Sequence, residues 1–183
     1  MPARRHLALV TAVLCAGLLS PASFAAGGGV AWVTVAPRSE TFRVAMPGTP
    51  KRRVKTTSTF AGTVEDVSYR WENGGEVYLV TRVELPVVAT FFMTDGFLFD
   101  QIRDSFLEKS NGTAAAYADV ERQNHGGKRL DFTMDETDGA RNARAEFFLV
   151  EGSMLSFTAM VPVGRPMTMT DRFFDSIELE RED

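Results

Sequence analysis

From Trp32 onward, apolar side chains recur at every second position, which is the period of a half-buried strand. The stretch "VEDVSYRW" (64–71) alternates in this way and runs into "ENGGE" (72–76), whose Asn-Gly pair is typical of a tight hairpin turn. The next stretch, "VYLVTRVEL" (77–85), is apolar on both of its faces. We therefore expect this strand near the centre of a sheet, covered on both sides.

Two further hairpins follow later in the chain. The first joins 116–123 to 128–134 through "NHGG" (124–127), and the second joins 141–150 to 153–161 through Glu151-Gly152. If one face of each strand turns inward, a single shared interior is expected to hold four of these side chains: Val67, Leu79, Phe132 and Phe157.

The hydrophobic period changes in two places. In "FLFDQIRDSFLEK" (97–109) apolar residues recur at three- and four-residue steps, with Thr94 or Asp95 as a start signal and Asn111-Gly112 as a stop signal. The stretch "RPMTMTDRFFDSIEL" (165–179) predicts a closing helix. Strand hairpins with two segregated helices favour an α+β fold: a mostly antiparallel β-sheet of about seven to eight strands with two packed helices.

The first 25 residues have the pattern of a secretory signal peptide. A short basic start is followed by an apolar run at 7–19 and by small residues before a predicted cleavage site after Ala25. Thirteen apolar residues are fewer than the roughly 20 that a membrane-spanning helix needs, and no later segment is longer. We expect a periplasmic or secreted protein with no transmembrane segment after cleavage, whether by the Sec or the twin-arginine route. Residues 26–31 are predicted to be a flexible lead-in, and residues 32–183 a single domain.

Charge and cysteine content exclude several kinds of chemistry. Cleavage would remove Arg4, Arg5 and the single Cys15, which changes the net charge from −4 to −6 and leaves a chain without cysteine. Disulfides, thiolate metal sites and thiol nucleophiles are then impossible. An acidic chain also has no electrostatic reason to bind nucleic acid. His125 would be the one remaining histidine. It could act as a general base or metal ligand, but in a glycine turn we expect it to be solvated, and we predict no metal and no cofactor.

Acidic and methionine clusters suggest other sites. The acids of "DETDG" (135–139) do not have the spacing of a calcium loop. Asp131 and Glu146 could form the acid couple of a weak hydrolase using acidic residues at 131–146, but on alternating strands we expect both to face solvent. Four methionines could bind cuprous copper, although core packing is the simpler interpretation: Met154, Met160, Met167 and Met169.

A basic cluster follows the turn in "FRVAMPGTPKRRVKTT" (42–57). At period two, Lys51, Arg53 and Lys55 share one face of a strand. A phosphate-binding loop would need several glycine N–H groups at a helix start, and Gly48 stands alone between prolines. We therefore predict a solvated surface strand whose charges discourage edge-to-edge pairing.

An apolar groove is a second candidate site. Phe91, Phe92 and Met93 stand directly before the predicted helix, and Phe99 lies within it. These side chains could line a groove between helix and sheet and carry an apolar ligand. Ordinary core packing is the alternative interpretation of the same residues.

Two stretches resemble a group of secreted bacterial proteins of unknown function. They are "FRVAMPGTP" (42–50) near the start of the domain and "RFFDSIEL" (172–179) near its end. That group is similar to PsbP, the extrinsic subunit of photosystem II, and the resemblance implies its α/β/α sandwich of a mostly antiparallel sheet between helices. No catalytic residues come with the resemblance. Our first hypothesis is therefore an exported, non-catalytic accessory or binding protein, which acts through surface contacts with an unknown protein or envelope component.

Overall fold

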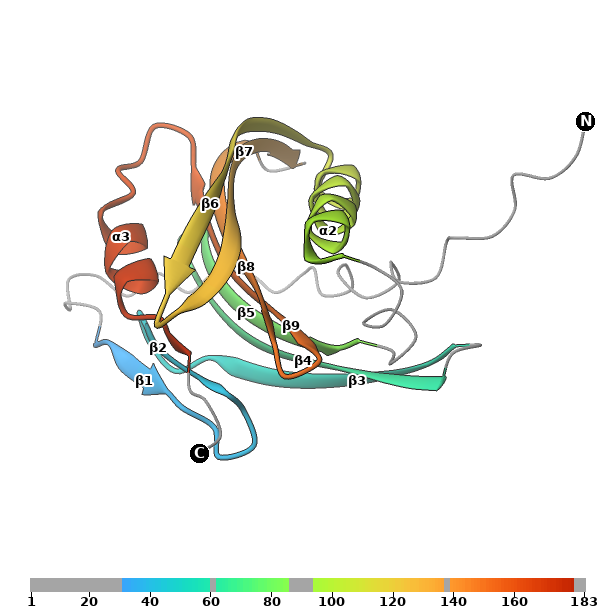
Figure 1. The fold of residues 1–183 in the computed structure, drawn as a ribbon. Helices are drawn as coiled ribbons and strands as arrows, with labels where there is room; N and C mark the ends of the chain where they lie inside the picture. Colours follow the sequence, from blue (N-terminus) through green and yellow to red (C-terminus); the bar gives the residue numbers. More distant parts are fainter. Residues whose placement is uncertain (1–30, 60–61, 86–93, 137–138, 180–183) are drawn as a thin grey trace, which may run out of the picture.

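The computed structural model describes residues 31–59, 62–85, 94–136 and 139–179. Most of these residues belong to one antiparallel seven-stranded sheet with the strand order β3-β4-β5-β9-β8-β7-β6 (Figure 1). β5 lies one strand from the centre and is buried on both faces over most of its length, as the sequence predicts. The strands are β3 (Lys51–Thr59), β4 (Gly62–Asn73), β5 (Glu76–Glu84), β6 (Gly112–Arg122), β7 (His125–Glu136), β8 (Gly139–Val150) and β9 (Ser153–Pro162).

Two of the predicted hairpins form within the stretches that the sequence indicates. β4 turns into β5 at Gly74 and Gly75, with φ values of +56° and +84°, one residue later than the predicted Asn-Gly pair, because Asn73 pairs with Glu76 in the ladder. β8 turns into β9 at Glu151 and Gly152, with φ values of +48° and +72°. Positive φ at both central residues gives the turn a twist that matches the right-handed twist of the flanking strands, which explains the glycines.

The third hairpin turns earlier than predicted. Gln123 and Asn124 have positive φ values of 43° and 64°, and His125 already pairs with Arg122 in the β6–β7 ladder. The expected turn at 124–127 is therefore wrong, and so is the expectation that His125 is solvated within it. Glutamine rarely adopts positive φ, but here the conformation is stabilised by a contact with the C-terminal strand β10 (Glu178–Leu179). The Leu179 N–H donates to the Gln123 Oε1 at 3.1 Å.

Helix α2 (Asp95–Ser110) contains the whole predicted range 97–109. The Thr94 hydroxyl accepts from Phe97 N at 3.4 Å at the N-terminus, and Asn111 ends the helix in the left-handed conformation. These are the start and stop signals that the sequence carries.

Helix α3 (Thr168–Asp175) is shorter than the predicted 165–179. The Ser176 hydroxyl accepts from Ala45 N at 2.8 Å and donates to Phe173 O at 2.7 Å, which fixes the end of the helix beside strand β2 (Phe42–Met46). The following residues pair with β2 as β10 instead of continuing the helix. β10, β2 and β1 (Val33–Val35) form a separate three-stranded sheet.

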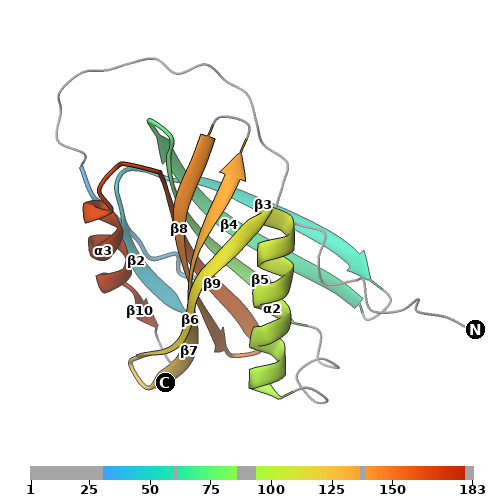
Figure 2. The same ribbon diagram turned by 90° about the horizontal axis from the view of Figure 1, so that it is seen from above.

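The large sheet carries one hydrophobic core on each face. The first face holds Val67 and Phe157, and α3 with the small sheet packs against it. The second face holds Phe132, and α2 covers it over β6 and β7. The two helices therefore lie on opposite sides of the sheet (Figures 1 and 2).

The expectation of one shared interior is accordingly wrong. Val67 and Phe157 lie in the first-face core and Phe132 in the second-face core, while Leu79 is buried on the second face outside both clusters. Alternation within one strand says which residues share a face, but not which side of the sheet that face becomes. The fold is nevertheless the predicted α+β arrangement of an antiparallel sheet with a helix on each side.

Candidate functional site

The basic cluster of the sequence lies on the outer edge of the large sheet. β3 is an edge strand, paired only with β4 in the described residues. Side chains 51–56 are all exposed, so both faces of this part of the strand are open to solvent. Figure 1 shows β3 and β4 reaching past α2 on the side away from α3. We call residues 51–56 the basic edge.

The two faces of the basic edge differ in charge. The register with β4 places Lys51, Arg53 and Lys55 opposite Arg70, Ser68 and Asp66 on the second face of the sheet. Lys51 thus stands directly across from another cation, an arrangement that costs stability unless a further charge compensates it. Arg70 is held by Glu72 at 2.9 Å.

The opposite face of the basic edge carries a mixed group. The Arg52 Nε donates to the Tyr69 hydroxyl at 3.3 Å, and Val54 beside it is 41% exposed. This face therefore offers an apolar contact next to a single cation, whereas the second face carries three cations, of which Lys55 stands across from Asp66.

The turn that leads into β3 is built on a glycine. Gly48 has a φ of +136°, and a Cβ at this position would lie 2.3 Å from Trp71 Nε1. The backbone here packs directly against the indole ring, and the Gly48 N–H donates to Met46 O at 2.8 Å. This close contact, and no phosphate-binding geometry, accounts for the glycine in "PGTP".

A second group of charges lies on the first face, within β6, β7 and β8. Glu146 is completely buried, and its carboxylate accepts from Arg122 Nε at 2.7 Å and from Arg129 Nη2 at 2.7 Å. The expectation that Glu146 faces solvent is therefore wrong. Period two placed it on the face opposite Phe147, but that face also packs into a core.

Asp131 forms an ion pair with a different arginine, Arg144. Arg144 Nε donates to its carboxylate at 2.7 Å, and Arg144 Nη1 lies 3.4 Å from Asp171 of α3. Asp131 and Glu146 are thus each paired with their own guanidinium groups and do not bond to each other in the described residues.

A third charged group was not foreseen from the sequence. Glu40 precedes β2 and is buried, and burial raises the pKa of its carboxyl even though Arg82 lies 3.5 Å away. Arg82 also donates to Ser153 Oγ at 3.2 Å and to Glu84 at 3.0 Å. Glu40 lies outside any periodic stretch, so no sequence pattern indicated that it would reach β5.

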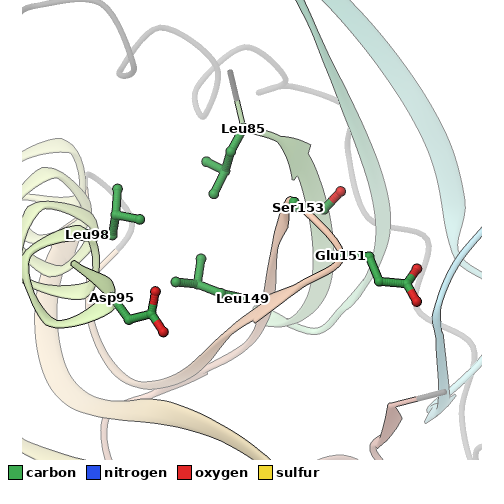
Figure 3. Close-up of a pocket in the computed structure, with 7 residues that line it drawn as sticks. Leu85, Asp95, Leu98, Leu149, Glu151 and Ser153 are labelled. Carbon is green, nitrogen blue, oxygen red and sulfur yellow. The ribbon is translucent and has the colours of Figure 1, made fainter. Parts of the chain in front are cut away.

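A small cavity lies between the start of α2 and the β8–β9 turn (Figure 3). Its volume is about 210 Å³, which is less than the 300–1,000 Å³ of typical ligand pockets. Three leucines and two acids line it together with Gly152 and Ser153: Leu85, Leu98, Leu149, Asp95 and Glu151. In Figure 3 the Glu151 carboxylate points away from the leucines.

The predicted apolar groove involves other residues. Phe99 is buried in the second-face core and does not line the cavity. Phe91, Phe92 and Met93 lie outside the described residues. The groove and its ligand therefore stay a prediction.

The remaining candidates do not come together into a metal site. His125 is half-buried, and its Nε2 has no hydrogen-bond partner in the described residues. Met160 packs against the second-face core and Met169 against the first, so the four methionines do not converge on one point. Within the described ranges, no three His, Asp or Glu side chains are grouped so that they could hold a metal ion.

No protein-family model and no curated protein sequence matches this chain. Solved structures do. The solution structure of cyanobacterial PsbP (CyanoP) from Synechocystis sp. PCC 6803 is similar with a TM-score of 0.58 and 14% identity, over 86% of this chain and 98% of that chain. The crystal structure of PA94, a protein of unknown function from Pseudomonas aeruginosa, has a TM-score of 0.40 and 11% identity, over 76% of this chain and 88% of that chain.

The similarity to CyanoP shows that this chain has a PsbP-like fold, as the resemblance of its two stretches implied. At 14% identity it shows the fold alone. Neither of the described helices is long and apolar enough to cross a bilayer.

Proposed function

We propose that this protein is an exported, non-catalytic accessory protein of the cell envelope, which binds a protein or envelope partner through its surface. The observation that carries the proposal is the basic edge: six consecutive exposed residues, four of them cationic, on the rim of a sheet in an acidic chain. Clustered exposed cations with no catalytic group beside them suit recognition better than catalysis.

The ion pairs of Asp131 and Glu146 support a non-catalytic role. Asp131 and Glu146 are neutralised by arginines from neighbouring strands, which is how structural ion pairs are arranged. The PsbP-like fold is compatible with the same role, because the resemblance to PsbP is one to an extrinsic accessory subunit.

The proposal includes export. Residues 1–25 have the pattern of a signal peptide with cleavage after Ala25. Intact-mass measurement of the protein recovered from its own cells should give a chain that begins at Ala26. A chain that retains Met1 or Pro2 at its start would contradict cleavage.

Photo-crosslinking in the native cells tests the proposed role. A photoreactive amino acid would be introduced at Arg53 on the basic edge, at Asp100 on α2 and at Glu178 on β10, which are exposed positions on three different surfaces. We expect one of these surfaces to give a dominant crosslink to a single envelope component, and the purified pair to bind in a direct assay.

A hydrolase assay tests whether the protein is non-catalytic. The purified protein is expected to be inactive on ester, peptide and glycoside substrates. Turnover that is lost in Asp131→Asn, while the variant keeps its thermal stability, would overturn the non-catalytic role.

A further inference from the structure

The basic edge has the properties of a site for strand addition. The backbone N–H and C=O groups of β3 that point away from β4 have no strand partner among the described residues, and side chains 51–56 are exposed on both faces. An extended peptide that pairs with these groups would become an eighth strand of the sheet. Main-chain hydrogen bonds supply affinity in this mode, and alternate side chains supply specificity.

Charge selects what can pair there. On the second face, an added strand would place one side chain opposite each of Lys51, Arg53 and Lys55, because paired strands keep the same alternation. Opposite-charge pairs across strands are favourable and like-charge pairs are not. Acidic residues at every second position of the partner therefore match this face.

The other face of the same strand adds a second requirement. Between Arg53 and Lys55 lies Val54, whose side chain is 41% exposed on the first face. A partner residue opposite Val54 would gain by being apolar. The pattern that fits is acid, apolar, acid across the middle of the strand, with polar residues elsewhere on the first face.

The same charges act against a second copy of this chain. If β3 paired with β3 of another molecule, cations would meet cations along the second face. Lys51 already stands opposite Arg70 within the molecule, so a second copy would place cations on both sides of Lys51. Edge charge of this kind excludes self-pairing and still admits an acidic strand.

We propose that the basic edge binds an extended acidic segment of a partner protein by strand addition to β3, with acids at alternate positions facing Lys51, Arg53 and Lys55. This inference rests on the proposed function and names the chemistry of the partner. It specifies an acidic protein segment rather than an anionic lipid, because only a polypeptide can pair with the backbone groups of β3.

The test uses a synthetic peptide of palindromic sequence, so that both strand directions present the same pattern: acetyl-Thr-Glu-Thr-Glu-Val-Glu-Thr-Glu-Thr-amide carrying a fluorophore. Its binding to the purified protein is measured by fluorescence anisotropy. We expect saturable binding that weakens at least tenfold in the variant Lys51→Glu/Arg53→Glu/Lys55→Glu and falls with rising salt.

A control variant separates position from net charge. Arg38→Glu/Arg43→Glu/Arg165→Glu changes the net charge by the same amount at exposed sites outside β3 and should weaken binding less than twofold. Circular dichroism of both variants establishes that they are folded. Equal loss in the two variants would mean unspecific attraction and would overturn the proposal.

Three further probes separate strand pairing from simple charge attraction. The peptide N-methylated at alternate residues keeps its charge but loses backbone donors, and it should not bind. A peptide of the same composition with its four glutamates in one block should bind at least fivefold more weakly. Vesicles containing anionic phospholipid should not retain the protein. Equal binding of the N-methylated or block peptide, or vesicle binding in place of peptide binding, would overturn strand addition.

The crosslinking experiment distinguishes this inference from the proposed function. Suppose that the peptide does not bind, while a crosslink from α2 or β10 identifies an envelope partner. The accessory role is then supported, and the proposal that the partner binds at β3 is wrong. If no surface gives a partner, the proposed function falls as well.

Discussion

The two edges of the seven-stranded sheet are protected in different ways. β6, at one edge, is rich in alanine and mostly exposed, and it carries two acids in its first ten residues, but its ladder is irregular and it contacts α2. α2 lies beside it (Figure 2). Its ladder with β7 shifts register between Ala114 and Ala116, and the Gln123 side chain after its last residue accepts a hydrogen bond from the backbone of β10. β3, at the other edge, is regular, exposed on both faces over residues 51–56 and protected by charge.

The difference teaches how each edge can be used. A register shift and an adjacent helix hinder strand addition whatever the charge of the partner. Charge blocks only partners of like sign, and an acidic strand removes the repulsion. The edge protected by charge is therefore the one that can be occupied selectively. The predictions below test this contrast, from the largest expected effect to the smallest.

The β6 edge depends on the buried carboxylate of Glu146. Replacing the completely buried Glu146 with Ala leaves the partly exposed side chains of Arg122 of β6 and Arg129 of β7 without their shared partner. We expect a loss of about 3–5 kcal/mol in the free energy of unfolding, measured with urea. Glu121→Ala, an exposed change on β6, should cost less than about 0.5 kcal/mol. Equal effects in the two variants would show that the buried group does not stabilise this edge.

The β3 edge depends on the turn at Gly48. Gly48→Ala would force a Cβ against the Trp71 indole and should cost about 2–4 kcal/mol. Gly139 has a similar φ of +123° but nothing within 4 Å of the added Cβ, so Gly139→Ala measures the conformational cost alone, about 1 kcal/mol. The difference between the two variants isolates the contact with Trp71. A difference near zero would contradict it.

Asp66 gives the basic edge a dependence on pH. Burial raises the pKa of its carboxyl from 3.8 to about 6, and Lys55 and Lys109 offset this only in part. The folded state therefore holds the proton of this carboxyl more tightly than the unfolded state does. The resulting contribution to the free energy of unfolding is fully present below about pH 4 and is lost as pH rises through 6.

Asp66→Asn carries no charge at any pH. It should therefore be more stable than the native protein by about 1–3 kcal/mol at pH 7.5, with little difference at pH 4. Urea unfolding at both values measures this, with the exposed Asp119→Asn as a control that should show no such trend. A stability difference that is the same at both pH values would contradict the raised pKa.

Removing the edge charge should have the smallest effect. Lys51→Thr/Arg53→Thr/Lys55→Thr leaves a β-prone, uncharged edge, which should begin to self-associate. Sedimentation equilibrium should detect dimers of this variant at protein concentrations where the native protein is monomeric. A variant that remains monomeric would show that charge is not what protects β3.

The elements whose signals are local could be predicted from the sequence. Thr94 and Asn111 define α2, and the glycines at 74, 75 and 152 define two hairpins. The turn at Gln123 could not be predicted, because its conformation depends on contacts with β10 from the far end of the chain. The end of α3 depends likewise on a hydrogen bond from Ala45 to Ser176.

The candidate site divides in the same way. The charge of the basic edge can be read directly from the order of its residues. Its position at the rim depends on the pairing of β5 with β9, which joins residues from Glu84 with Ser153 to Val77 with Met160, 69 to 83 positions apart, and leaves β3 outside. The burial of Glu146 was missed because period two assigns a face but cannot tell that both faces are covered.

Amide hydrogen exchange of the native protein, with and without the acidic peptide, tests the central claim most directly. If the peptide adds to the sheet as a new strand, the outward-pointing amides within residues 51–57 will exchange at least tenfold more slowly in the complex, while exchange in β6 is unchanged. Protection that appears on β6 or α2, or binding that leaves the amides of β3 exchanging at their original rates, would contradict it.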